Sequence, residues 1–368
     1  MGQYTIYHLH SDLSNGVTNI DSVTKYQEYI DAAKECGMTS LGFSEHGSVF
    51  EWYHKKKSVE AAGMKYIHAA EVYLTATLDE KVRDNFHCVL AAKNYDGFLE
   101  LNSLISKSFS RADGDNHFYY VPRISFEELF NTSKNILVTT ACIGGVLGKS
   151  FENPNEYNTN AVQRFLNFLA SNKDRCFLEI GHHPDQRQKE YNQYLNEYSK
   201  KTGLLLIAGT DTHVLNSSHE EGRSILQKAK NIHFDGEDGW DLKFKTYDEL
   251  VAAYRRQAAL PEKVFMEAIE NTNLFADMIE PFQIDCSAKY PHIYDNPEET
   301  FKNKIETAIQ THPYARKNHT EDELRATAEK EFEVYKKANA IDFMLLQTYL
   351  REWEKKNGVE CGYGRGSV

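Results

Sequence analysis

Histidines and acidic residues occur in short clusters along the sequence, and these residue types could hold metal ions. The chain has 15 histidines, and the first two form the pair His8-Leu9-His10. Alternate residues of an extended segment point the same way, so both imidazoles can reach one metal ion. A single pair of this kind is also found as two ordinary polar residues at the end of a strand. The inference therefore depends on whether similar groups recur.

Similar groups accompany six further apolar segments. They are Glu45-His46-Gly47, Glu71, His87, Cys142, Glu179 with His182 and His183, and Asp211-Thr212-His213. A buried histidine or carboxylate without a partner is costly. Metal ions would explain the whole set, because each cation offsets several carboxylate charges and accepts imidazole nitrogen. A merely polar barrel mouth is the alternative interpretation.

The donor types indicate which metals and which chemistry to expect. Mixed nitrogen and oxygen donors suit Zn²⁺, Mn²⁺ or Fe²⁺, and a thiolate from Cys142 favours zinc. The donors outnumber those that one tetrahedral ion can use, which predicts two or three divalent ions. Such clusters generate hydroxide near neutral pH and hold phosphoryl oxygens, so phosphoester hydrolysis is the leading chemistry. Amide hydrolysis by a barrel metalloenzyme uses overlapping residue types and is the main competitor.

Seven apolar runs predict the strands that position these groups. They lie at residues 4–8, 41–43, 65–75, 86–91, 135–140, 176–180 and 204–208. Helical patterns separate most of them, as in 22–36, where apolar residues recur at three- and four-residue spacing and Gly37 follows. Strands that alternate with helices imply a parallel sheet. The count favours a closed barrel, in which reactive residues collect at the C-terminal ends of the strands.

The chain changes character after residue 207. Helical patterns cover residues 220–230, 247–256 and 261–278. The stretch 280–298 is less regular and contains three prolines, which marks a candidate domain boundary. We therefore expect one domain over residues 1–280 and a second over 281–368, with helices at 300–310, 321–339 and 341–356.

Composition excludes several classes of protein. The 42 basic and 54 acidic residues give a net charge of −12, which argues against a protein whose main task is wrapping duplex DNA. No apolar run approaches the roughly 18 residues of a membrane helix, and we expect no membrane partner. The N-terminus lacks the pattern of a secretory signal. Six scattered cysteines fit a reducing compartment, so the expected location is cytoplasmic.

Taken in order, these motifs resemble the PHP (polymerase and histidinol phosphatase) family, and within it the N-terminal PHP domains of bacterial DNA polymerase III alpha subunits. The motifs are His8-x-His10, Glu45-His46-Gly47, Ala70-Glu71-Val72-Tyr73, His87 followed by Leu90-Ala91-Ala92-Lys93-Asn94, Thr140-Ala141-Cys142 and Gly209-Thr210-Asp211-Thr212-His213. The resemblance covers nearly the whole chain. It implies an α/β fold, with a distorted seven-stranded (β/α) barrel followed by a partial, mainly helical polymerase palm segment.

The resemblance also implies a site with three metal ions and nine ligands. The ligands carry over to His8, His10, Asp21, His46, Glu71, His87, Cys142, Asp211 and His213. Glu71, Asp211 and His213 are the expected catalytic residues, with Glu71 as the carboxylate that bridges a metal pair.

Three positions depart from the family pattern or stay open. Asp21 follows the second histidine later than in the family, which implies a short insertion around residues 15–17, and Asp12 is the alternative ligand. Glu45 replaces the usual aspartate and is expected to orient a ligand imidazole from outside the ligand set. His182 and His183 lie where family members have polar groups that face the substrate, so they are not expected to be ligands.

The function implied by the resemblance is metal-dependent 3′–5′ exonuclease activity, which would serve proofreading. The partners would be the primer 3′ end of DNA, the remainder of the polymerase and other replisome subunits. Two alternatives stay open. One is a small-molecule phosphatase of the histidinol-phosphatase type, and the other is a metal-stabilised structural platform for the polymerase.

The last residues resemble a phosphate-binding motif of the polymerase palm. Gly364, Arg365, Gly366 and Ser367 offer backbone amides, a guanidinium and a hydroxyl suited to nucleotide phosphate. A flexible terminal turn is the alternative. In the family, the two catalytic aspartates of the palm lie beyond this motif, so this chain is not expected to polymerise DNA by itself. It would be a fragment of a longer polymerase or one half of a split one.

Overall fold

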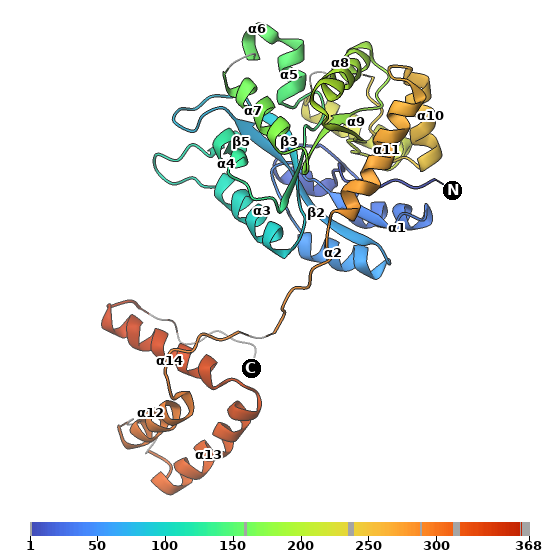
Figure 1. The fold of residues 1–368 in the computed structure, drawn as a ribbon. Coiled ribbons are helices and arrows are strands. Elements are labelled where there is room, and N and C mark those ends of the chain that lie inside the picture. The colour runs from blue at the N-terminus through green and yellow to red at the C-terminus, as the bar shows by residue number, and fades with distance from the viewer. Residues whose placement is uncertain are drawn as a thin grey trace. The chain divides into compact units, whose positions relative to one another are not determined.

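The computed structural model describes residues 2–157, 160–234, 239–287, 289–311, 317–360 and 362. It divides into two compact units, Met1–Gln283 and Ile284–Val368 (Figure 1). The proposed phosphate-binding residues 364–367 lie outside the described residues. Among the residues that the structure does describe, no helix is both long and apolar enough to cross a membrane.

The first unit is built on a curled sheet, which contains all eight strands of the described residues. They are β1 (Ser40–Phe43), β2 (Lys65–Thr75), β3 (Phe86–Ala92), β4 (Phe118–Tyr119), β5 (Val121–Ser125), β6 (Ile136–Thr139), β7 (Cys176–Ile180) and β8 (Leu205–Ala208). The strands pair in the order β4-β5-β2-β3-β6-β7-β8, and β1 also pairs with β2. The order of the main strands confirms the α/β class. The short pair β4 and β5 was not predicted.

The predicted first strand, residues 4–8, is not a regular strand. It runs between the two ends of the curled sheet and touches each through an isolated parallel bridge, Ile6 with Leu41 and Leu9 with Thr212. Backbone hydrogen bonds support both contacts, from Gly42 N to Ile6 O at 2.8 Å and from His10 N to Thr212 O at 2.8 Å. This segment therefore takes the seventh position of a barrel that is distorted where it closes.

The prediction of a parallel sheet is wrong for β3. This strand pairs antiparallel with β2 on one side and with β6 on the other. The connection from β2 to β3 spans only residues 76–85 and contains no helix. A parallel connection needs a crossover of a dozen or more residues, so these two strands form a hairpin.

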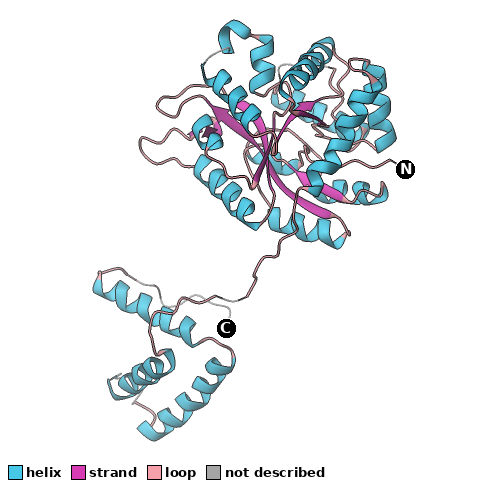
Figure 2. Ribbon diagram, viewed as in Figure 1, coloured by secondary structure: helices cyan, strands magenta, loops and turns pink. Residues whose placement is uncertain are grey.

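Helices lie around the outside of the curled sheet (Figure 2). In the first unit they are α1 (Tyr26–Glu35), α2 (Trp52–Ala61), α3 (Tyr95–Ser108), α4 (Phe126–Phe130), α5 (Val146–Glu152), α6 (Pro154–Tyr157), α7 (Asn160–Ser171), α8 (Gln186–Thr202), α9 (Ser217–Lys230), α10 (Tyr247–Gln257) and α11 (Glu262–Asp277), with the 3₁₀ helix η1 (Asp12–Gly16). Helix α1 begins four residues later than the predicted Ser22. The Ser22 hydroxyl instead donates to the backbone carbonyl of His213, at 2.5 Å.

Helix α11 packs against the end of the barrel where the parallel strands begin. Its Phe275 is fully buried, with ring centroids 4.9 Å from Tyr7 and 5.6 Å from Phe177. The backbone amide of Thr5 donates to the Thr272 hydroxyl at 2.9 Å. Apolar side chains of β2, β3, β6, β7 and β8 complete this interior cluster. The opposite end of the barrel is left for polar groups.

The second unit contains α12 (Pro297–Thr311), α13 (Glu321–Lys337) and α14 (Ile341–Lys356). Four buried residues form its core, Phe301, Phe332, Ile341 and Leu345. Helix α13 begins with a capping box, in which Thr320 and Glu323 satisfy each other's backbone amides. The regular elements in the described part of this unit are all helices, as the sequence predicts for this region.

Candidate metal centre

Three groups of side chains that could hold a metal ion lie at the polar end of the barrel, and all of their residues except His87 are buried. The donor atoms within each group lie within 4.8 Å of one another. The groups are His10, Asp21, His46 and His213; His8, His10 and Asp211; and His46, Glu71 and His87. Together they contain eight of the nine ligands that the family resemblance implies. The ninth, Cys142, has its Sγ 3.7 Å from Nδ1 of His87.

Strand periodicity brings these groups to one place. On β2, Ile67 and Ala69 belong to the interior apolar cluster, and Glu71 follows at the same two-residue spacing. Alternate residues of a strand share a face, so Glu71 continues that face beyond the apolar interior. Strand β3 runs in the opposite direction, and its early residue His87 pairs with Tyr73 near the end of β2. The start of β3 therefore lies at the same rim as the ends of its parallel neighbours.

Glu71 is the centre of the constellation, because each of its carboxylate oxygens faces two imidazoles. Its Oε1 lies 3.0 Å from Nδ1 of His87 and 3.4 Å from Nε2 of His8. Its Oε2 lies 2.9 Å from Nδ1 of His46 and 3.3 Å from Nε2 of His10. A carboxylate in this arrangement can bridge two cations.

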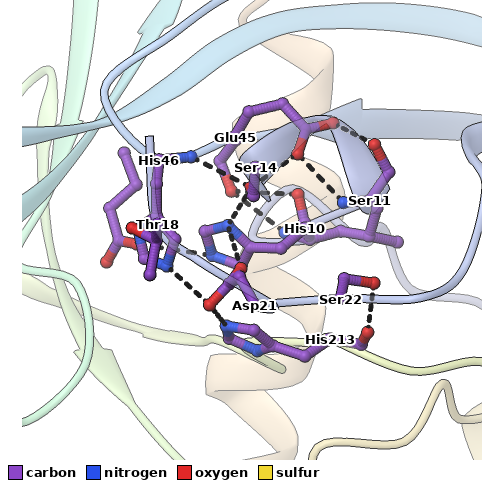
Figure 3. A network of polar contacts seen from close by, with 12 residues as sticks. His10, Ser11, Ser14, Thr18, Asp21, Ser22, Glu45, His46 and His213 are labelled. Carbon is purple, nitrogen blue, oxygen red and sulfur yellow. Dashed lines mark hydrogen bonds and ion pairs between the residues drawn. The ribbon is translucent and has the colours of Figure 1, made fainter. Parts of the chain in front are cut away.

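Asp21, and not Asp12, joins the cluster. Its Oδ1 lies 3.3 Å from Nε2 of His46 and 3.4 Å from Nε2 of His213 (Figure 3). The side chain of Asn15 fixes this loop, since its Oδ1 accepts the backbone N–H of Asp21 at 2.7 Å. Asp12 begins η1, is half-buried, and belongs to none of the three groups among the described residues.

Two residues of the site adopt backbone conformations that L-residues rarely take. Asp211 has a φ of 43°, and Ala141, which precedes Cys142, has a φ of 56°. Left-handed conformations cost about 1–3 kcal/mol at non-glycine residues and persist where the surroundings impose them. Asp211 is itself a proposed ligand and Ala141 directly precedes another, so both unusual conformations lie at the candidate site.

A buried carboxylate outside the three groups orients His8. The Nδ1 atom of His8 lies 2.5 Å from Oε1 of Glu179. The other Glu179 oxygen accepts hydrogen bonds from the hydroxyls of Tyr7 at 2.9 Å and Thr139 at 2.7 Å. This network directs Nε2 of His8 toward Glu71 and Asp211. A hydrogen bond from the far ring N–H to a carboxylate typically sets the orientation of a ligand histidine.

Glu45 supports His10 in a similar but indirect way. Its carboxylate accepts hydrogen bonds from the Ser11 hydroxyl at 2.5 Å and the Ser14 hydroxyl at 2.7 Å. Ser14 Oγ in turn lies 3.2 Å from Nδ1 of His10 (Figure 3). Lys55 completes the network with a fully buried ion pair to Glu45 at 3.1 Å. These contacts match the orienting role that the sequence predicts for Glu45.

The electrostatics of the cluster favour ionised carboxylates. Burial alone would raise the pKa of the Glu71 carboxyl group. His87, His8 and His46 together have a larger, opposite effect, so the pKa lies well below its ordinary value. Burial also raises the pKa of Asp21, and His213 and His46 bring it well below the ordinary value. At neutral pH these carboxylates are therefore charged.

The pKa values of His10 and Cys142 are shifted in the directions expected of buried groups. Burial, with help from His46 and His213, lowers the pKa of His10 to about 4, so its imidazole is neutral at pH 7. Burial raises the pKa of the Cys142 thiol, and Asp211 adds to this effect. Metal ions bind neutral imidazole and deprotonate a coordinating thiol, so both residues suit cation binding.

Unpartnered buried atoms test whether cations fit this site. Among the buried side-chain atoms that have no hydrogen-bond partner in the described residues, six belong to the three donor groups: Nε2 of His8, Nε2 of His10, Oδ2 of Asp21, Nδ1 of His46, and Oε1 and Oε2 of Glu71. Buried polar atoms are nearly always hydrogen-bonded, and each exception calls for a physical reason. Cations bound by the three groups would satisfy these six atoms together.

His182 and His183 lie apart from the three groups. Both are buried, and their rings lie 5.0 Å apart. His183 stacks on Trp240, with ring centroids 4.5 Å apart and an angle of 7° between the planes. Burial lowers the pKa of His183 to about 4. Within the described part of the chain, neither histidine belongs to one of the three donor groups.

Sequence reasoning did not assign two of the residues that position the site. Glu179 was noted only as one polar group at a strand end, although it lies two residues after the interior Phe177 and so shares its face of β7. That spacing was the available signal. The run Lys55-Lys56-Lys57 is typical of an exposed helix face, so the sequence gives no sign that Lys55 is buried. In the structure Lys55 is 1% exposed.

A cavity of about 470 Å³ opens onto the cluster. Residues of the donor set line it, among them Asp21, His46, Glu71, Asp211 and His213. His87 and Cys142 also reach it, and Lys149 and Arg187 contribute cationic side chains. A volume of 300–1,000 Å³ is typical of pockets for small ligands. The cavity is therefore large enough for a phosphorylated group beside the metal-binding atoms.

Comparison with known proteins identifies sequences related to this chain. The model of the PHP domain matches residues 7–183. The chain is 27% identical to the DNA polymerase III subunit alpha of Aquifex aeolicus over 389 aligned residues, which cover 98% of this chain and 32% of the relative. It is 27% identical to the same subunit of Borreliella burgdorferi, with 98% of this chain and 31% of that protein covered. The chain thus spans about a third of the length of the curated relatives that it matches.

One solved structure, of a protein assigned as a metal-dependent phosphoesterase from Bifidobacterium adolescentis, aligns with a TM-score of 0.37 and 12% identity. The alignment covers 69% of this chain and 97% of that one. A similarity this low supports no inference of its own. The sequence matches do support one: this chain contains a PHP domain, within a sequence homologous to DNA polymerase III alpha subunits.

Proposed function

We propose that the first unit is a metal-dependent phosphoesterase that removes nucleotides from the 3′ end of a DNA strand. The observation that carries the proposal is the three adjacent donor groups beside one cavity, in which six buried atoms have no hydrogen-bond partner. Homology to DNA polymerase III alpha subunits makes DNA the substrate that fits best. Proofreading during replication would be the corresponding role.

The ligand set divides into three proposed metal positions. His8, His10 and Asp211 would hold one ion, and His46, Glu71 and His87 a second, with Cys142 beside His87. His10, Asp21, His46 and His213 would hold the third. Zn²⁺, Mn²⁺ and Fe²⁺ all suit these donors. When bound, such ions supply a nucleophile at neutral pH and offset the charge of phosphoryl oxygens.

The chain's own residues would orient the reacting groups. Glu71 contributes both carboxylate oxygens, while Glu179 fixes His8 and the Ser14–Glu45 pair fixes His10. Lys149 and Arg187 line the same cavity, where their positive charges would attract the phosphate of the substrate. The homology further suggests that the chain works in the cytoplasm with the rest of a polymerase and other replisome subunits.

Elemental analysis combined with a nuclease assay tests this proposal. The purified chain should contain two or three divalent ions, and it should shorten single-stranded or primer–template DNA from the 3′ end. His10→Ala and Asp211→Asn should abolish the trimming. If no DNA is cleaved across a screen of Zn²⁺, Mn²⁺ and Fe²⁺, the proposal fails. Turnover of a small phosphomonoester without DNA cleavage would favour a small-molecule phosphatase.

A structural platform gives a different result in the same experiment. Metal removal would lower the melting temperature, and the nuclease assay would show no cleavage with or without metal. The homology to polymerase subunits also makes residues 281–368 the proposed start of a polymerase palm, with Gly364, Arg365, Gly366 and Ser367 as its phosphate-binding residues.

A further inference from the structure

The lining of the cavity also includes residues that are chemically different from the donor groups. They are the aromatic residues Phe234 and Trp240 and the cationic residues Lys149 and Arg187. None of these four residues belongs to the proposed ligand set. A ligand that fills the cavity would therefore meet both metal-binding atoms and aromatic side chains.

The imidazole of His183 stacks on the indole ring of Trp240. The two rings lie nearly parallel, at 4.5 Å between ring centroids. His183 is 1% exposed, and its backbone carbonyl accepts a hydrogen bond from Nε2 of the buried Gln257 at 2.6 Å. Stacking on a fixed, buried ring orders the indole before any ligand binds. Such preorganisation lowers the entropic cost of binding.

Two cationic side chains line the same cavity. The guanidinium carbon of Arg187 lies over the Trp240 ring, 6.0 Å from its centroid, and Arg187 also forms an ion pair with Glu152 at 3.1 Å. The ammonium of Lys149 donates to the backbone carbonyls of Asp84 and Asn85, both at 2.9 Å, which fixes it at the cavity wall. Aromatic rings interleaved with cations are the usual platform for a nucleobase and its phosphates.

We propose that Trp240 is the stacking platform for the base of the nucleotide whose phosphate lies against the donor groups. The inference rests on the proposed function and names its substrate class, a nucleotide with an intact base. Nucleobase and phosphate could come from a free mononucleotide or from the 3′ end of a DNA strand. The two sources share the same recognition chemistry, and the experiment below separates them.

Tryptophan fluorescence measures the contact directly, without turnover. The full chain is titrated with dAMP, with 2-deoxyribose 5-phosphate, which lacks a base, and with a ten-nucleotide single strand of deoxyadenosine. We expect dAMP to quench the fluorescence of the unmodified chain and the base-free sugar phosphate to leave it unchanged. Trp240→Leu should remove the quenching, whereas Trp353→Leu, at an exposed tryptophan of the second unit, should keep it.

The oligonucleotide arm identifies the source of the base. If a strand end is the ligand, the ten-nucleotide strand should bind at least tenfold more tightly than dAMP, and a strand whose 3′-terminal residue lacks its base should lose that advantage. Equal binding of strand and mononucleotide assigns the platform to free nucleotides. Equal quenching of the unmodified chain and Trp240→Leu would overturn the proposal.

Kinetics give a second, independent readout. Trp240→Leu should raise KM for trimming of the strand by about 10- to 100-fold with little change in kcat, because stacking contributes to binding of the base. Trp240→Phe should restore most of the loss, which a merely misfolded variant would not allow. An unchanged KM in Trp240→Leu, in a chain that does trim DNA, refutes the stacking role and leaves the proposed function intact. Quenching by dAMP in a chain that cleaves no phosphoester refutes the proposed function and leaves the stacking role intact.

Discussion

The carboxylate of Glu179 lies 2.5 Å from Nδ1 of His8, at the buried end of a hydrogen-bond network that also includes the hydroxyls of Tyr7 and Thr139. The contact fixes which ring nitrogen of His8 faces the donor groups. Glu179 has little room to move, because even a Cβ added at Gly209 would lie 2.1 Å from its Oε1. The position of one proposed ligand is thus set by a residue outside the ligand set.

Glu179→Gln should weaken metal binding while keeping the fold. The amide has the same shape, but it loses the charge that favours His8 as a donor, and loss of such a partner typically lowers metal affinity about 10- to 100-fold. Competition between the chain and a chelator of known affinity measures the change. Glu190→Gln, an exposed residue of α8, is the control. Equal affinity of Glu179→Gln and the unmodified chain would contradict an orienting role.

Lys55→Met should destabilise the first unit by about 3–5 kcal/mol, because it leaves the Glu45 carboxylate buried without its cation. Chemical denaturation at neutral pH measures the free energy of unfolding. The neighbouring Lys57 is exposed on the same helix, so Lys57→Met should change stability by less than about 0.5 kcal/mol. A similar small effect for both variants would show that the ion pair contributes little.

Phe275→Ala should cost about 3–5 kcal/mol, because it opens a cavity beneath the barrel where Phe275 packs on Tyr7 and Phe177. The adjacent Leu274 is 43% exposed, and Leu274→Ala should have a far smaller effect. Thermal and chemical unfolding of both variants checks the prediction. Comparable losses for the two positions would mean that α11 does not seal the barrel.

Stability should fall as the pH drops below about 6.5, and His68 should account for part of the loss. Burial lowers the pKa of His68 to about 3, so the folded state resists a proton that the unfolded chain accepts near pH 6.5. The stabilisation is complete above the unfolded pKa and is lost as the pH falls toward the folded pKa. Between pH 7 and pH 5 the loss amounts to about 2 kcal/mol.

His68→Gln tests that assignment. The glutamine cannot be protonated, so the free energy of unfolding of this variant should change by about 2 kcal/mol less between pH 7 and pH 5 than that of the unmodified chain. Both proteins are measured with a chelator present, so that metal binding does not contribute. His54→Gln, at an exposed histidine of α2, serves as the control. Parallel pH dependences for His68→Gln and the unmodified chain would contradict the prediction.

Local sequence patterns located most elements of the first unit but not the direction of every strand. Apolar runs placed six of the strands within a few residues, because each run is buried on both faces. The direction of β3 depended on the connection from Thr75 to Phe86, which is too short for a helical crossover. That signal was present in the sequence and was not used. The four-residue error at the start of α1 has a tertiary cause, the hydrogen bond from Ser22 to His213.

The proposed ligands were easier to predict from the sequence than the residues that hold them in position. The nine proposed ligands are recognisable by residue type, order and family resemblance, and the structure brings them together. Lys55 and Trp240 could not be assigned from sequence, because their roles depend on contacts with Glu45 and His183 that no periodicity reveals. The choice of Asp21 over Asp12 likewise depends on a loop held by the side chain of Asn15.

The hydrogen bond between Thr5 and Thr272 spans 267 residues, and the proposed ligands extend from His8 to His213. During synthesis on the ribosome, the first histidines would emerge long before their companions exist. No early portion of the nascent chain could complete the cluster or seal the barrel. Closure of this unit must therefore wait until α11 has been translated, and contacts so distant in sequence predict slow folding and a period of dependence on chaperones.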